Sequence, residues 1–196
     1  MQLKQDDPIA RFLEDYERAK IGASFEPSRA ALATSSLGGV PSVRYVLVKW
    51  VDERGFRIFT NYTSRKARFL DENPRASLAF HWENLGEQVR VEGRVERLSA
   101  EESDAYFAAR PRGSKIGAWA SPQSHEIASR EELIALVEEV ERRFEGVEDI
   151  PRPDFWGGYL LIPETIEFWF DGDNRLHDRF LYTREGDGYR CRRLAP

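Results

Sequence analysis

The chain has 196 residues, of which 41% are hydrophobic and 32% charged, and its formal net charge is −5. This length allows one domain with a full core, and this composition is typical of a globular protein and not of a disordered one. The net negative charge argues against general nucleic-acid binding, but it leaves room for a local basic patch that binds one small anion.

Cysteine usage and the N-terminus predict the compartment. Cys191 has no second cysteine to pair with, and no Cys/His cluster has metal-ligand spacing, so the sequence predicts neither an internal disulfide nor a metal site. Met1 to Asp7 carries three charges and no apolar segment, which argues against a signal peptide, and no apolar run approaches membrane length. We expect a cytoplasmic protein that is a single domain over residues 1–196, with neither a membrane nor a nucleic acid as partner.

Helical periodicity begins near the N-terminus. Asp7, followed by proline, is a helix-start signal, and apolar residues then recur at helical spacing, so residues 8–20 are predicted to form an amphipathic helix. A short helix is expected over 64–73. Two more should begin at Ser99 and Ser129, because each precedes a glutamate at the capping-box position.

Short apolar segments separated by turn signals predict β-strands over most of the remaining chain. The expected strands are 30–35, 42–51, 56–61, 75–81, 87–98, 158–162, 165–170, 176–183 and 188–193. Strands first, helices in the middle and strands last imply a mainly β fold, an antiparallel barrel with peripheral helices.

A basic segment near the C-terminus is the first candidate site. If residues 175–180 form a strand, Arg175, His177 and Arg179 point to one face. Two guanidiniums beside an imidazole, with Trp169 on the neighbouring strand, are suited to holding an anion and moving protons beside it. The alternative is the ordinary solvated face of a half-covered sheet.

Two cations mark the ends of an otherwise apolar strand, Arg44 and Lys49. Their spacing is odd, so in a regular strand they face opposite sides. One ligand then meets both only through a bulge, the twist of the strand, or contact along an edge. Alternatively, each charge simply marks a strand end.

Two phosphate sites are further candidates. A helix that begins at Ser64 places Arg65 and Lys66 at its positive dipole end, a conflict that a phosphate bound to the free amides would relieve. The alternative there is a tolerated surface cost. The second group surrounds a break between helices and comprises Tyr106, Arg110, Arg112, Ser114 and Lys115, which alone is indistinguishable from a basic loop.

Taken in order, these segments resemble the pyridoxine/pyridoxamine 5′-phosphate oxidase family. No Gly-x-Gly-x-x-Gly motif, Walker loop or nucleophile elbow competes with this interpretation. The matching motifs are Arg44 to Lys49, Thr60-Asn61, Ser64 to Ala67, Asn73 to Arg75, Gln88-Val89, Arg110 to Arg112 with Ser114, Ile116 to Trp119, Gln123-Ser124, Phe155 to Gly158, Ile166 to Trp169, Arg175 to Phe180, and Arg193 to Pro196. Each is weak alone, but their ordered combination is specific and spans nearly everything after residue 30.

The resemblance implies an FMN-binding split β-barrel that works as a homodimer, with two flavins at the subunit interface. The implied FMN contacts are Arg44, Tyr45, Val46, Leu47, Val48, Lys49, Phe59, Thr60, Arg65, Lys66, Gln88, Gln123, Ser124, Trp169 and Arg179, with Arg65 and Lys66 on the phosphate. The implied substrate contacts are Lys49, Tyr106, Arg110, Ser114, Arg175 and His177, of which the last two act in catalysis.

The implied reaction is that of a pyridoxal 5′-phosphate synthase, an oxidoreductase acting on CH–NH2 donors. A hydride equivalent passes from C4′ of pyridoxine 5′-phosphate or pyridoxamine 5′-phosphate to flavin N5, and O2 is reduced to hydrogen peroxide. Two alternatives stay open: a phenazine-biosynthesis-type flavin oxidase that acts on a larger aromatic acid, and a non-catalytic protein that binds flavin or pyridoxal phosphate.

Two positions depart from the family pattern. Family members usually carry an upstream segment with an Arg and a Tyr that close over the substrate, and Met1 to Asp7 contains neither. Phe59 stands where a Tyr is common, although a backbone contact there would survive the change. The first departure predicts a site that is more open to water and binds its substrate more weakly.

Overall fold

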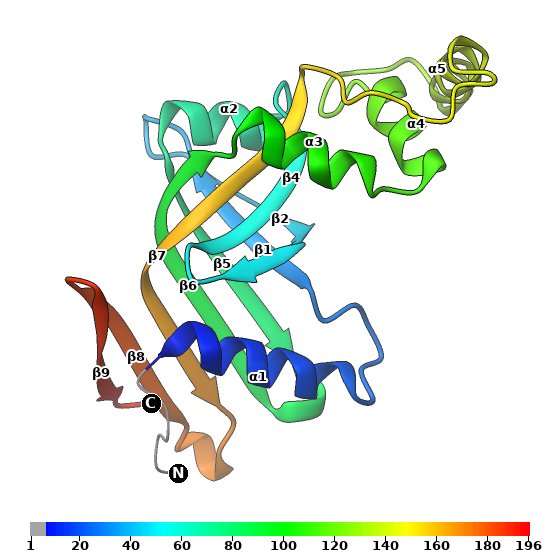
Figure 1. Cartoon of the computed structure of the whole chain (residues 1–196). Helices are drawn as coiled ribbons and strands as arrows, with labels where there is room; N and C mark the ends of the chain where they lie inside the picture. The colour runs from blue at the N-terminus through cyan, green and yellow to red at the C-terminus, as the bar shows by residue number, and fades with distance from the viewer. Residues whose placement is uncertain (1–6) are drawn as a thin grey trace.

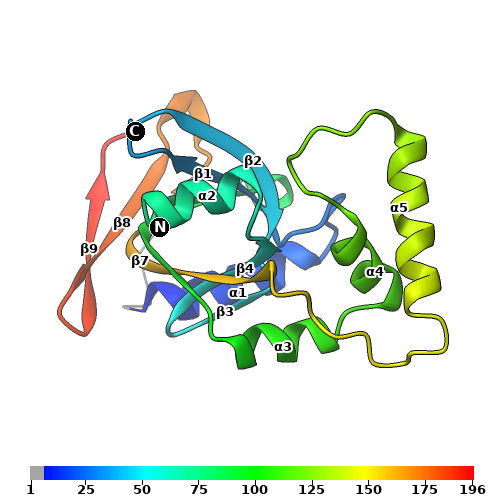
Figure 2. The same ribbon diagram turned by 90° about the horizontal axis from the view of Figure 1, so that it is seen from above.

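The computed structural model describes residues 7–196, so the prediction about Met1 to Asp7 falls almost wholly outside the described part. Its sheet is antiparallel and has nine strands in the order β2-β1-β5-β6-β7-β4-β3, with β8 paired to β7 and β9 to β8. Figure 1 shows the sheet curling around α1, and Figure 2 shows α3, α4 and α5 on the side opposite the β8–β9 hairpin. The predicted mainly β fold with peripheral helices is confirmed.

The elements follow the predicted order. The strands are β1 (Arg29–Ser35), β2 (Pro41–Leu47), β3 (Trp50–Asp52), β4 (Gly55–Asn61), β5 (Arg75–Trp82), β6 (Glu87–Arg97), β7 (Trp156–Phe170), β8 (Asp178–Glu185) and β9 (Gly188–Leu194). The helices are α1 (Pro8–Lys20), α2 (Arg65–Glu72), α3 (Ala100–Ala108), α4 (Arg112–Ala120) and α5 (Arg130–Arg143), with 3₁₀ turns η1 (Glu83–Leu85) and η2 (Asp173–Arg175). Within residues 7–196, no helix is long and apolar enough to cross a bilayer.

The predicted helix starts are confirmed by their caps. The Asp7 side chain accepts a hydrogen bond from the Ile9 amide at 2.8 Å, and Ser99 forms a complete capping box with Glu102. Ser129 caps α5 by accepting from the Glu132 amide, but the glutamate carboxylate returns to the amide of Ala128 and not to that of Ser129.

The main core fills the inside of the curled sheet. Phe12 of α1 packs edge-on against Phe56 and Phe80, with ring centroids 4.9 Å apart in both pairs, and Trp82 is fully buried beside them. A second cluster, built around Phe107 and Trp156, joins α3 and α4 to the start of β7. These two clusters fix the walls between which the candidate site lies.

The segment predicted as one strand over 42–51 is two strands, so that prediction was wrong. The Val48 amide donates to Ser28 O and the Lys49 amide donates to Arg57 O, both at 2.9 Å. The backbone therefore changes partner between these two residues, from β1 to β4. This break removes the alternation that set Arg44 and Lys49 on opposite faces.

β7 is one long strand, whereas two strands were predicted over 158–162 and 165–170. The register with β6 shifts between Glu92 and Gly93, which leaves a bulge opposite them instead of a chain break. A Cβ on Gly93 would lie 2.0 Å from Ile162 O, so only glycine fits. The first half of β7 pairs with β4 and the second half with β8, and this is where the sheet splits.

Arg175 and His177 do not lie on a strand, contrary to the prediction for residues 175–180. β8 begins at Asp178, and Asn174 and Arg175 have left-handed φ values of 54° and 64°. The Gly172 amide donates to His177 Nδ1 at 3.2 Å and closes this loop. The two side chains are thus presented by a tight loop, and only Arg179 has a strand position.

Candidate active site

A cleft of about 300 Å³ lies between β2, β4, α2 and α3. The predicted site residues that line it are Tyr45, Val46, Leu47, Lys49, Phe59, Thr60, Lys66, Tyr106, Arg110 and Gln123. They come from five separate parts of the sequence. The structure therefore brings half of the predicted cofactor and substrate residues to one place.

Lys66 is the most tightly held cation of the cleft. Its ammonium donates to Gln123 Oε1 at 2.7 Å, Thr60 Oγ1 at 3.0 Å and Ser64 Oγ at 3.3 Å. All three acceptors are neutral. Burial, and secondly the charge of Arg44, lower the pKa of Lys66 to about 8. An anion in the cleft would supply the charge that this ammonium lacks.

The start of α2 carries the second positive feature. Ser64 is fully buried at the N-cap, but its hydroxyl makes no capping bond, and no acidic residue lies in the first turn. Arg65 is exposed there. Arg44 donates to Leu32 O and Thr34 Oγ1, both at 2.9 Å, and burial followed by the charge of Arg65 lowers its pKa. This end of the cleft is positive and contains no carboxylate partner for these arginines among residues 7–196.

Aromatic rings form the opposite wall. Phe59 and Tyr106 stack with centroids 3.8 Å apart, and the Arg110 guanidinium lies 4.6 Å from the centre of the Trp156 ring. One terminal nitrogen of Arg110, Nη1, is buried and has no hydrogen-bond partner among the described residues. Burial lowers the pKa of Arg110 and raises that of Tyr106. A buried guanidinium nitrogen without a partner is a vacant donor for an anionic group.

Several predicted residues do not line the cleft. Ser114 is exposed in the first turn of α4, and Ser124 is exposed with a φ of 70° next to Gln123. Arg112 instead donates to Phe144 O and Val147 O, which follow α5. Lys115 is buried in α4 and does not line the cleft. Of the basic loop, Arg110 alone reaches the cleft.

A second group of predicted residues gathers at the other end of β7. Gln88 pairs with Trp169 across β6 and β7, Trp169 pairs with Arg179 across β7 and β8, and the His177 ring lies 4.4 Å from the Trp169 ring. Arg175 stands exposed in the preceding loop. The cleft includes Trp156, the first residue of β7, whereas this group, the C-terminal group, lies around Trp169 near the end of that strand. Figure 1 shows the course of β7 between its two ends.

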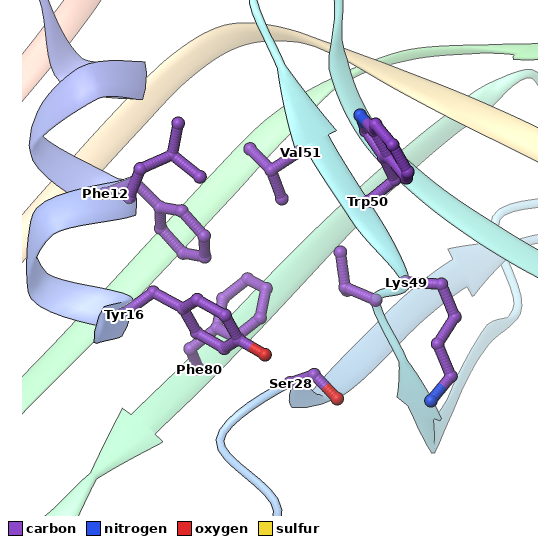
Figure 3. Close-up of a pocket in the computed structure, with 9 residues that line it drawn as sticks. Phe12, Tyr16, Ser28, Lys49, Trp50, Val51 and Phe80 are labelled. Carbon is purple, nitrogen blue, oxygen red and sulfur yellow. The ribbon is translucent and has the colours of Figure 1, made fainter. Parts of the chain in front are cut away.

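A smaller pocket of about 70 Å³ lies behind Lys49, between α1 and β3. Phe12, Tyr16 and Phe80 form one side of it, and the Lys49 side chain extends away from Phe12 (Figure 3). Its walls are mainly apolar. It is an extension of the core, although Lys49 lines both this pocket and the cleft.

Two residues that the structure places beside the predicted site residues were not assigned a role from the sequence. Trp156 lines the cleft beneath Arg110 but was noted only as part of a motif. Glu167 is 3% exposed and bridges Arg90 and Arg179 on the face that carries the C-terminal group. The signal for Glu167 was its two-residue spacing from Trp169, which places both on one face of a strand.

Two family models and several curated proteins match this chain. Residues 19–144 match the family model described as pyridoxamine 5′-phosphate oxidase, and residues 156–196 match the one described as pyridoxine 5′-phosphate oxidase C-terminal dimerisation region. The pyridoxine/pyridoxamine 5′-phosphate oxidase of Rubrobacter xylanophilus is 56% identical and covers 97% of this chain and 87% of its own. The protein of the same name from Anaeromyxobacter dehalogenans is 57% identical and covers 97% and 96%.

Solved structures show the same fold. PhzG from Burkholderia lata 383, in complex with tetrahydrophenazine-1-carboxylic acid, has a TM-score of 0.92 at 33% identity and covers 98% of this chain and 94% of its own. A pyridoxamine 5′-phosphate oxidase-related, FMN binding protein from Nostoc punctiforme has a TM-score of 0.78 at 17% identity over the full length of both chains. The fold is thus the predicted split barrel, and the chain belongs to the pyridoxine/pyridoxamine 5′-phosphate oxidase family.

Proposed function

We propose that the protein is an FMN-dependent oxidase that converts pyridoxine 5′-phosphate, pyridoxamine 5′-phosphate or both to pyridoxal 5′-phosphate, with O2 as electron acceptor and hydrogen peroxide as by-product. One observation carries the proposal. The cleft holds Lys66 against neutral acceptors and Arg110 with a vacant buried nitrogen, so its cations lack the anions that would compensate them. A phosphorylated cofactor beside a phosphorylated substrate supplies two such anions.

The residues of the cleft fit FMN. Lys66 and Arg65 would hold its phosphate at the start of α2, where the amides of the first turn have no side-chain cap. Thr60 and Gln123, already in contact with the Lys66 ammonium, would keep that ammonium in place. Ser124 and the segment from Arg44 to Lys49, which includes the end of β2 and the break after it, complete the contacts that we assign to the cofactor.

Substrate recognition falls to the aromatic wall. Arg110, Lys49 and Tyr106, which line the cleft, would bind the substrate phosphate, and the Phe59–Tyr106 stack would exclude water from one side of the ring. When bound, FMN would accept the hydride equivalent from C4′ and pass the electrons to O2. The protein's own task is to position C4′ and to manage the proton.

His177 and Arg175 are assigned that task. The Gly172 amide and the Asp171 carboxylate lie 3.2 Å and 3.3 Å from His177 Nδ1, so Nε2 is the ring nitrogen that would face a bound substrate and exchange a proton with it. Trp169 packs against the ring and holds its orientation. Arg175 would orient the substrate by charge. We assign Gln88 and Arg179 of the C-terminal group to the flavin.

A homodimer would unite the two groups. Trp156 and Trp169 are separated by about 40 Å along β7, counted from the rise per strand residue, so one chain does not present both groups to a single flavin. The outer face of β2 exposes Val43 at 69% and Tyr45 at 75%, which suits burial against a second copy. We propose that the partner subunit supplies the C-terminal group, and that the enzyme is a single-domain cytoplasmic homodimer.

The activity is tested by purifying the protein, recording its flavin spectrum, and following peroxide after addition of either vitamin B6 phosphate. The proposal expects a yellow protein and peroxide in stoichiometric amount. A colourless protein without FMN affinity would refute it. A yellow protein that is inert on both compounds, but oxidises a reduced phenazine carboxylate, would establish the second candidate, which the similarity to PhzG supports. A yellow protein inert on all of them would be a binding module.

The shared site is tested by complementation. Arg110→Ala and Arg175→Ala homodimers should each be nearly inactive, since each lacks one half of both sites. In a mixed dimer, one of the two sites carries both substitutions and the other carries neither. Random mixing should therefore restore about a quarter of wild-type activity. No recovery in a mixture shown to contain mixed dimers would place both residues in one subunit's site.

A further inference from the structure

Glu167 occupies the centre of the sheet face that carries the C-terminal group. Its strand position is directly opposite Arg90 of β6, and Trp169 on the same face is opposite Gln88 and Arg179. The other face of these strands, with Phe168 and Phe180, belongs to the core. Glu167, to which no role has been assigned, thus shares this face with Gln88 and Arg179, which we assign to the flavin, and with Trp169, which holds the His177 ring.

The carboxylate is buried and fully engaged. Its side chain is 4% exposed; Oε1 accepts from Arg179 Nε at 2.8 Å and Oε2 accepts from Arg90 Nη2 at 2.6 Å. Burying a charge is unfavourable unless partners of opposite charge compensate it. With one guanidinium on each oxygen, the carboxylate has a single orientation that satisfies both arginines.

The Arg179 side chain is fixed at two points. Besides Glu167, its Nη1 donates to Ala195 O near the C-terminus at 3.0 Å. Within residues 7–196, no hydrogen bond engages its Nη2, so one end of the fork stays available to a ligand. The ion pair with Glu167 is also the first cause of the raised pKa of Arg179.

We propose that Glu167 is a positioning residue, which aims the Arg179 guanidinium at the bound flavin and is itself held in place by Arg90. Glu167 does not touch the cofactor and acts through Arg179. The inference rests on the proposed function, because it takes FMN as the ligand that Arg179 contacts. It adds a buried ion-pair triad to the residues that determine cofactor affinity.

Glu167→Gln is the informative substitution. An amide has one acceptor oxygen and a donor NH2 group, so it accepts from one arginine and opposes the other. Equilibrium titration with FMN, followed by flavin fluorescence, should show affinity lowered by about tenfold. The matched control is Glu164→Gln on the same strand, where the carboxylate pairs with Arg75 at 2.7 Å with a side chain 44% exposed. The control should leave FMN affinity unchanged.

Combination with Arg179→Gln distinguishes positioning from a general structural role. If Glu167 acts through Arg179, the double variant should bind FMN no more weakly than Arg179→Gln alone. Multiplied losses, or a Glu167→Gln affinity equal to that of Glu164→Gln, would overturn the proposal. If Glu167→Gln fails to fold, Glu167→Asp keeps the charge but withdraws it from Arg179, and the same expectations apply. Failure of the wild type to bind FMN would refute the proposed function instead.

Discussion

Lys66 gives the cofactor affinity a predicted dependence on pH. Its pKa is lowered to about 8, so about nine-tenths of the side chain is charged at about pH 7 and about one-tenth at about pH 9. The phosphate of FMN has its second pKa near 6, so its charge is constant over this interval. If the charged ammonium is the form that binds phosphate, FMN affinity should fall about tenfold as the pH rises from 7 to 9.

The direction follows from the cause of the shift. Burial removes water from the ammonium, and its neutral acceptors Gln123, Thr60 and Ser64 do not replace the lost solvation with charge. A bound phosphate reverses this and raises the pKa again, so proton uptake accompanies binding above about pH 8. Tyr106 does not interfere, because burial raises its pKa further from this range.

The assay is an FMN titration at several pH values with a matched variant. Lys66→Arg keeps the charge but does not titrate, so its affinity should be independent of pH over the same interval. Lys66→Met should bind weakly at every pH. The reasoning would be refuted if the wild-type dissociation constant were the same at both ends of the interval, or if Lys66→Arg retained the slope of the wild type.

Three further predictions concern Arg175 in the loop before β8, the buried Glu87, and the aromatic wall of the cleft. Arg175→Ala should lower turnover severely while FMN stays bound, as measured by peroxide release and flavin absorbance. Burial and then the charge of Asp15 raise the pKa of Glu87 to about 8, above its value in the unfolded chain. Protonated Glu87 therefore stabilises the folded state at acid pH, and this contribution is lost as the pH rises through 8. The free energy of unfolding in urea should lack this loss in Glu87→Gln. Gly158→Ala places a Cβ 2.4 Å from Leu98 Cδ1 and 2.8 Å from Phe59 Cε1. By displacing the Phe59–Tyr106 stack, it should raise KM for the substrate more than it weakens FMN binding.

The sequence predicted most elements because their signals are local. The Asp7 cap, the Ser99 capping box and the alternation over β6 each depend on residues close together in the chain, and all three appear in the structure. The prediction of one strand over 42–51 was wrong because the break in that strand depends on hydrogen-bond partners that are distant in the sequence. The amides of Val48 and Lys49 bond to Ser28 and Arg57, which a local pattern cannot reveal.

The sequence predicted which residues belong to the candidate site, but not how those residues are arranged in space. Motif order identified Lys66, Gln123 and Arg110, yet their convergence on one cleft depends on α2 and the loops on either side of α4 meeting in space. The strand prediction for the residues of the loop before β8 was wrong for a different reason. Its alternating basic residues imitate a strand face, while a left-handed turn at Asn174 and Arg175 interrupts the extended backbone.

The length of β7 explains why the chain would need a second copy of itself. A strand that pairs with β4 at one end and with β8 at the other keeps the sheet continuous, but it also holds the cleft and the C-terminal group at opposite ends. Shortening the strand would bring them together only by removing the split that creates the cleft wall at Trp156. In the proposed homodimer, a two-fold axis would resolve this conflict without changing the fold, because it would set the C-terminal group of each subunit beside the cleft of the other. The exposed apolar face of β2 borders that cleft through Tyr45 and Leu47, so the contact that would bury this face would also close the site.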